Sequence, residues 1–350
     1  MRDLRIEGSP LRRSRPESAS GLHMTTEPTV ARRPWKFGPL EILAVGAVVL
    51  VVAQPRLVGL FDHPALQAGA TVFVSIIVQA LPFLVLGVLL SAAIAAFVPR
   101  EFWQRALPAN RVVAVPVAGA AGLLLPGCEC ASVPVAGSLM ARGVTPAAAL
   151  AFLLSAPAIN PIVLVSTFVA FPGQPQMVVA RLVASFATAV IMGWLWLRFG
   201  RAKWLRMPER SHLQGGSPFH TFRLTASHDF LHAGGFLVVG GLAAAVMNVA
   251  MPTEWMESIS GNPVLAVLGL ALLAVVLSIC SEADAFVAAS FTSFSLTARL
   301  AFLVVGPMID LKLMSMQVGI FGRAFAWRFA PATFVVAVIM SSLIGWWLLS

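Results

Sequence analysis

Long apolar stretches recur along nearly the whole chain, and they limit what it can fold into more than any other feature. Hydrophobic residues make up 58% of the sequence and charged residues only 11%, whereas a soluble domain carries about 25% charged residues. A helix that crosses a bilayer needs about twenty consecutive apolar residues. The pattern predicts an all-α polytopic membrane protein with about seven full spans and two shorter hairpins, or roughly eight to ten hydrophobic helices. The expected spans are 39–60, 68–98, 146–170, 177–199, 229–250, 299–321 and 329–349.

Basic residues outside the apolar stretches set the expected orientation. Residues 1–37 carry eight Lys or Arg residues and are expected to form a disordered cytoplasmic tail. Cytoplasmic loops are enriched in Lys and Arg, so the loops 99–111 and 200–228 are expected on that side, and Arg181 on or near the opposite side. The net charge of +9 is an orientation signal on this interpretation, and nucleic acid is not an expected partner. The predicted parts are the tail 1–37, a first membrane half 38–199, a cytoplasmic loop 200–228 and a second membrane half 229–350.

Two further apolar stretches, 112–141 and 263–295, are each interrupted near the middle by polar residues. The first interruption is Cys128-Glu129-Cys130, and the second runs from Cys280 to Asp284. Each arm has about fifteen residues, or roughly 22 Å of helix, which is short of the ~30 Å hydrocarbon core. An even number of crossings is needed between the basic loops, so each stretch is predicted to be a re-entrant hairpin or a pair of short spans.

The second membrane half repeats part of the first. Leu150-Ala151-Phe152-Leu153 matches Leu300-Ala301-Phe302-Leu303 at an offset of 150, and the same offset pairs Cys130 with Cys280. An alternative is chance similarity between apolar segments. The first copy would start from outside and the second from inside, so the sequence predicts two repeats of inverted topology, each with a broken or re-entrant hairpin. That architecture is typical of secondary transporters, which bind solute between the repeats near the midplane.

Two hairpin tips and two proline-broken spans are expected to meet at that midplane. Cysteine thiols are soft ligands suited to Cu(I), zinc or a thiophilic metalloid, although a free cysteine can also be a small buried apolar residue. Proline removes a backbone hydrogen bond and leaves carbonyl groups near a break in the helix free for a ligand. The candidate substrate-binding residues are Cys128, Cys130, Cys280, Asn160, Pro157 and Pro307.

Charged side chains at membrane depth are costly and usually line a pathway or pair with one another. Asp284 or Glu282 is the first choice for proton or cation coupling, and a structural ion pair with Lys312 is the alternative. Asp310 and Lys312 are two residues apart, so they can pair only if the helix unwinds. The candidate ion-coupling residues are Glu129, Glu282, Asp284, Asp310 and Lys312. No catalytic residue, resident metal or cofactor is expected.

These motifs resemble the signatures of a bacterial family of permeases. The first comprises Cys128-Glu129-Cys130, Val133-Pro134, Arg142-Gly143 and the segment 155–161; the second comprises 278–286 and 306–312. The similarity covers about residues 70–345. The best-known members of this family are organoarsenical efflux permeases, so the resemblance implies an inner-membrane permease. For characterised relatives it implies efflux of trivalent organoarsenicals, with a cysteine of the motif involved.

The sequence is therefore interpreted as a secondary permease that exports a small solute, most simply a thiophilic metalloid species, with or without proton coupling. No P-loop motif occurs in it, so active transport would depend on an ion gradient or a partner. The expected partners are this solute, the lipid bilayer and, as an open alternative, further copies of the chain. Rival interpretations are a membrane-embedded thiol redox enzyme, a permease or passive channel for an unrelated solute, and a subunit of a larger complex.

Overall fold

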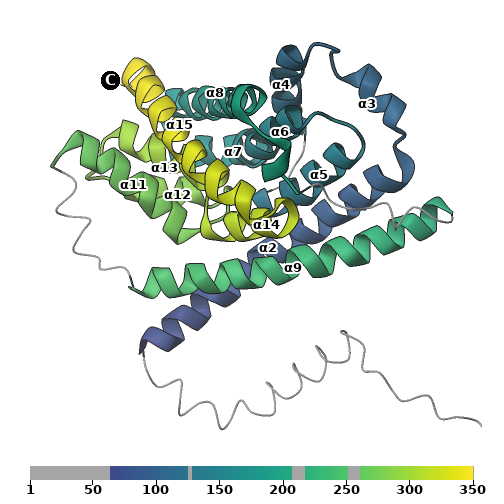
Figure 1. Ribbon diagram of the computed structural model, residues 1–350. Coiled ribbons are helices and arrows are strands. Elements are labelled where there is room, and N and C mark those ends of the chain that lie inside the picture. Colours follow the sequence, from purple (N-terminus) through teal and green to yellow (C-terminus); the bar gives the residue numbers. More distant parts are fainter. Residues whose placement is uncertain (1–63, 125–127, 207–216, 251–260, 350) are drawn as a thin grey trace, which may run out of the picture. The chain divides into compact units, whose positions relative to one another are not determined.

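The computed structural model describes residues 64–124, 128–206, 217–250 and 261–349, and the regular elements in these ranges are all helical (Figure 1). The predicted tail 1–37 and the predicted span 39–60 lie outside the described residues. The first half contains α2 (Pro64–Phe97), α3 (Arg100–Ala106), α4 (Arg111–Ala120), the short 3-10 helix η2 (Ala121–Leu124), α5 (Glu129–Ala141), α6 (Pro146–Ile159), α7 (Pro161–Ala170), α8 (Pro175–Phe199) and the 3-10 helix η3 (Ala202–Trp204). The second half contains α9 (Pro218–Ala250), α11 (Pro263–Leu277), α12 (Asp284–Ser290), α13 (Leu296–Met308), α14 (Leu311–Phe321) and α15 (Arg323–Leu349).

Five of the described helical segments are long and apolar enough to cross a membrane: 64–97, 146–170, 175–199, 218–250 and 323–349. The arms 111–124 and 263–277 are shorter apolar helices, as the two predicted hairpins require. The predicted span 299–321 is instead divided between α13 and α14. Helix α9 begins eleven residues before the predicted start at 229, at Pro218. No Gly or Pro follows Pro218 before Gly234, so the polar residues in between do not end the helix.

Six helices of the second half follow the order of six in the first. The starting residues of α6 and α13 differ by 150 (Pro146 and Leu296), and so do those of α7 and α14 (Pro161 and Leu311). The breaks that precede α7 and α14 also have the same kind of cap. The Asn160 side chain accepts a hydrogen bond from the backbone N–H of Val163 at 2.9 Å, and Asp310 accepts one from Leu313 at 2.6 Å. The two breaks are thus alike in their position, at an offset of 150 residues, and in their capping.

The proline residues expected to break the spans lie inside helices. Pro157 is within α6 and Pro307 within α13, and each precedes the break by about three residues. The breaks themselves fall at Asn160 and at Ile309–Asp310, whose backbones are extended. A side chain at such an N-cap satisfies a backbone donor that the interrupted helix would leave unpaired. The capping residues therefore define the breaks.

Helices α2 and α9 pack against each other and cross in Figure 1. Helix α2 also packs on α5, and α9 packs on α14, so the long pair contacts the first helix after each of two breaks. Helix α6 is buried along nearly its whole length. At the crossing of α2 and α5, a Cβ atom added to Gly87 would overlap the Cα of Ala131. Gly87 therefore sets how closely α2 approaches the helix that carries Cys130.

Substitution of Gly87 by Leu should destabilise the protein by about 1–3 kcal/mol, because overpacking forces the backbones of α2 and α5 apart. Thermal unfolding of the purified protein in detergent measures this loss. The matched control is Gly69→Ala on the same helix, where an added Cβ lies 3.4 Å from a Val249 methyl group. Equal melting temperatures for Gly87→Leu and the control would contradict the close contact.

Candidate functional site

The first hairpin presents two cysteines and a glutamate at the start of α5. Cys128 is extended and is the N-cap, while Glu129 and Cys130 belong to the first helical turn. This change of backbone direction places both thiols together, which a continuous helix would not do. All three side chains are buried, and one ligand atom from each lies within 4.8 Å of the others. Residues 125–127 of the predicted unwound turn lie outside the described residues.

The second hairpin presents Cys280 from a non-helical segment between α11 and α12. Helix α11 ends at Leu277, and Ser278 adopts a left-handed backbone with φ of 50°. That conformation is costly for a residue with a Cβ and occurs in constrained functional segments. It turns the chain out of α11, and the buried Cys280 follows two residues later. A second interruption predicted from polar residues is therefore a real break in the helix.

The two hairpin tips meet through their thiols. The Cys128 side chain lies close enough to those of Cys130 and Cys280 to interact with both. Cys280 is also 3.7 Å (Sγ) from the Nζ atom of Lys312. The three cysteines are free of disulfides and buried. Cys128 and Cys280, which are 152 positions apart in the chain, thus belong to one thiol cluster.

Lys312 is the cation of this cluster and joins three segments. Its Nζ lies 2.7 Å from Glu129 Oε1 and 3.5 Å from Asp310 Oδ2, and it donates a hydrogen bond of 2.8 Å to the carbonyl oxygen of Ser278. Lys312 and both carboxylates are fully buried. Asp310 and Lys312 can pair because the helix is broken at Asp310, which is the condition that the sequence set. With two carboxylates and one ammonium, the ionised group carries one net negative charge, which favours an added proton or other cation.

Arg181, which the sequence analysis counts among the residues on or near the outside, is buried inside the protein. It lies on α8, its side chain is fully buried, and its Nη2 is 2.7 Å from Asp284 Oδ2. Nη1 donates a 2.8 Å hydrogen bond to the Thr167 hydroxyl. The alternative of a structural ion pair with Lys312 does not hold for Asp284, whose partner is Arg181. Unlike Arg198 in the last turn of α8, Arg181 is flanked on both sides by apolar residues of the helix, which was a signal for a buried role.

The remaining predicted residues surround this centre in different ways. Asn160 is buried and uses its amide to cap α7 and to donate to the Ala156 carbonyl at 3.2 Å. Glu282 lies in the turn between Cys280 and α12, and its Oε1 is buried with no hydrogen-bond partner among the described residues. Glu129 Oε2 is also buried without a hydrogen-bond partner among the described residues. Such atoms are costly unless a proton, a water molecule or a ligand satisfies them.

A second polar network was not predicted from the sequence. Asp229 on α9 accepts a 2.9 Å hydrogen bond from the Ser91 hydroxyl on α2, and Ser91 is 2.7 Å from the Ser138 hydroxyl on α5. Ser138 in turn donates to the Ser91 carbonyl. Asp229 was placed at the edge of a predicted span, where a charged residue attracts no attention. The early start of α9 moves it into the helix and against its neighbours.

Several long apolar helices around a buried group of thiols and charges define a multi-pass membrane protein. Residues 66–346 match the family model described as a predicted permease, and the chain belongs to that family. The sequence-based family assignment is thus confirmed. The chain is 37% identical to UPF0718 protein YcgR of Bacillus subtilis (strain 168) over 278 residues, which cover 77% of this chain and 94% of that protein.

A second relative comes from Streptococcus mutans serotype c (strain ATCC 700610 / UA159). The chain is 34% identical to it over 298 residues, which cover 82% of this chain and 98% of the relative. That protein is named "Putative two-component membrane permease complex subunit". No solved structure matches the chain significantly. Membership of a permease family is consistent with a transporter rather than an enzyme.

The Lys312→Met variant should lose about 3–5 kcal/mol of stability, because it leaves two carboxylates buried without their cation. The double variant Lys312→Met/Glu129→Gln should recover part of this loss, since one uncompensated charge is removed as well. Thermal unfolding in detergent at neutral pH measures both. The control is Lys203→Met on η3, an exposed lysine whose substitution should change stability by no more than about 0.5 kcal/mol. A single variant as stable as the wild type would refute the buried charge cluster.

Proposed function

We propose that the protein is a secondary permease of the bacterial inner membrane that exports a small thiophilic solute, with a trivalent organoarsenical as the first candidate. The observation that carries this proposal is the cluster of three thiols, two from one hairpin tip and one from the other, next to the Lys312 ammonium. Soft sulfur ligands favour soft cations and metalloids. On this proposal the amino terminus is cytoplasmic, and the solute enters the site from the cytoplasm.

The chemistry of the site suits a solute that exchanges hydroxyl groups for thiols. When a trivalent arsenical with an As–OH group reacts with a cysteine, an As–S bond forms, the As–OH bond breaks, and the thiol proton leaves with the hydroxyl as water. Lys312 lies 3.7 Å from Cys280 Sγ and would stabilise negative charge on sulfur during the exchange. Reversal of the same exchange with water releases the solute, so binding consumes no redox equivalent.

Two buried ion pairs provide a route for coupling to protons. Glu129–Lys312 joins α5 to α14, and Asp284–Arg181 joins the second hairpin to α8. Each pair therefore connects the first half to the second. A proton on either carboxylate weakens its attraction to the cation, which lowers the cost of moving one half relative to the other. The predicted inverted repeats would then rock about the hairpins, as secondary transporters with this architecture do.

One rival has a specific observation in its favour. The Streptococcus mutans relative is named as a subunit of a two-component permease complex. By analogy, this chain would need a second protein or a second copy for transport. That version keeps the thiol site but predicts no transport by the purified chain alone. A thiol redox enzyme is the other rival, and it predicts a covalent change in the substrate without net flux.

Everted membrane vesicles containing the wild-type chain should accumulate trivalent methylarsenite when a proton gradient is present, because everted vesicles turn export into uptake. Accumulation should fall at least about tenfold in Cys128→Ser/Cys130→Ser, since the tip of the first hairpin then offers no thiol. An uncoupler should abolish gradient-dependent accumulation in the wild type, and Asp284→Asn should make the remaining flux insensitive to it. Uptake is measured as arsenic per milligram of protein.

The control for the cysteine variants is Ser342→Ala, a hydroxyl removal on α15 far along the chain from both tips. Its hydroxyl donates a local hydrogen bond to the Val338 carbonyl oxygen, so uptake should match the wild type. Equal arsenic content in vesicles with and without the chain would exclude this solute. The same vesicles with a coexpressed partner protein, compared with proteoliposomes of the purified chain, separate the single-chain permease from the two-component version.

A further inference from the structure

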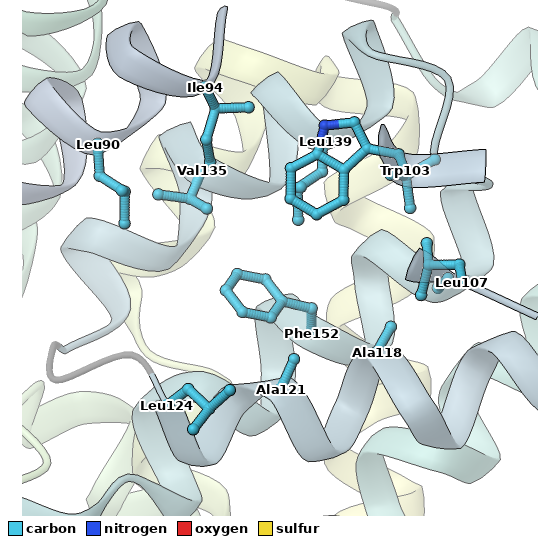
Figure 2. A pocket seen from close by; sticks show the side chains of 12 residues that line it. Leu90, Ile94, Trp103, Leu107, Ala118, Ala121, Leu124, Val135, Leu139 and Phe152 are labelled. Carbon is cyan, nitrogen blue, oxygen red and sulfur yellow. The ribbon is translucent and has the colours of Figure 1, made fainter. Parts of the chain in front are cut away.

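A cavity of about 250 Å³ lies between the arms of the first hairpin, and none of the residues that line it is charged. Its walls come from α2, α3, α4, η2, α5 and α6, and Figure 2 shows apolar side chains such as Leu90, Val135 and Phe152 around it. Apolar cavities of about 150 Å³ stay dry and bind apolar guests. This cavity therefore calls for an apolar occupant.

One polar atom among the lining residues indicates that the occupant carries a hydrogen-bond acceptor. The indole of Trp103 on α3 projects into the space in Figure 2. Its Nε1 atom is buried and has no hydrogen-bond partner among the described residues. Buried indole N–H groups are normally paired. A molecule that fills the cavity and carries an acceptor oxygen, such as an ester carbonyl, would satisfy it.

The helix that carries Trp103 also has the features of a membrane interface. Helix α3 has only seven residues, and it exposes Phe102 together with Glu101 and Arg105. Arg111 is exposed at the start of α4, and it follows the lining residue Leu107 by four positions in the chain. Two exposed arginines against one glutamate leave a net positive rim. The loop 99–111 is expected on the cytoplasmic side, where anionic lipids attract basic residues.

We propose that this cavity binds one acyl chain of an anionic phospholipid from the cytoplasmic leaflet. An ester carbonyl accepts the hydrogen bond of Trp103, and the phosphate lies near Arg105 and Arg111. The bound chain separates α4 and α5, the two arms whose tip carries Cys128. The lipid is thus part of the hairpin structure. This inference does not depend on which solute the thiol site takes.

Native mass spectrometry of the purified chain in detergent tests this directly, with phosphatidylglycerol and phosphatidylcholine added separately. The wild type should retain one phosphatidylglycerol at activation energies that strip the other lipids, and should retain phosphatidylcholine at least about fivefold less. Ala121→Phe, which fills the cavity, should abolish the retained lipid. The matched control is Leu242→Phe on α9, an exposed apolar position outside the lining, which should retain it.

Two milder variants divide the site into its parts without filling it. Trp103→Phe keeps the ring but removes the N–H donor, and it should lower retention of both lipids equally. Arg105→Gln/Arg111→Gln should remove only the preference for phosphatidylglycerol, whereas Arg323→Gln, an exposed arginine on α15, should leave it intact. These variants also keep the test valid if Ala121→Phe fails to fold.

Three results would overturn the proposal. Retention of phosphatidylglycerol by Ala121→Phe at the wild-type level would mean annular lipid only. Equal retention of the two lipids by the wild type would remove the role of the basic rim. Copurification of the wild-type chain with one molar equivalent of an apolar compound that lacks phosphate would assign the cavity to a different ligand.

Discussion

The burial of Lys312 between two carboxylates is the interaction on which the rest of the structure depends. An ammonium and two carboxylates lose several kcal/mol each when they leave water, and only close mutual contact offsets that loss. The distances of 2.7 Å to Glu129 and 3.5 Å to Asp310 supply this contact. Glu129 begins α5 after one break, and Asp310 caps α14 after another. The breaks in the helices therefore allow the charged side chains to meet, and the contacts between these side chains keep the two broken segments next to each other.

Much of this arrangement follows from sequence patterns with a simple physical basis. Apolar length located the spans that the structure describes, and arms of about fifteen residues predicted hairpins too short to cross. The 150-residue offset between Cys130 and Cys280 placed these cysteines at corresponding points, and the structure brings them into one cluster. Asp310 and Lys312 are two residues apart, so the sequence gives the condition for their pairing, which is that the helix unwinds.

The sequence did not reveal contacts between side chains that are far apart in the chain. Arg181 was treated as an orientation charge, because charge counting cannot distinguish an arginine near a helix end from one that meets Asp284 inside the protein. Asp229 required knowledge that α9 starts early and faces Ser91. Pro157 and Pro307 drew attention as helix breakers, yet Asn160 and Asp310 terminate the helices by capping the next ones. For Arg181 and Asp229 the missing information was a tertiary contact, whereas at the two breaks it was the local capping by Asn160 and Asp310.

The central claim is that the two hairpin tips meet in one thiol site, and thiol cross-linking tests it most directly. In a Cys130→Ser chain with a protease site inserted between residues 210 and 211, a short bifunctional thiol reagent should join Cys128 to Cys280. After cleavage, the two halves should then migrate as one species on a denaturing gel, and as two when Cys280 is also replaced by Ser. Separate halves in both chains, with both thiols shown to be modified singly, would mean that the tips do not meet.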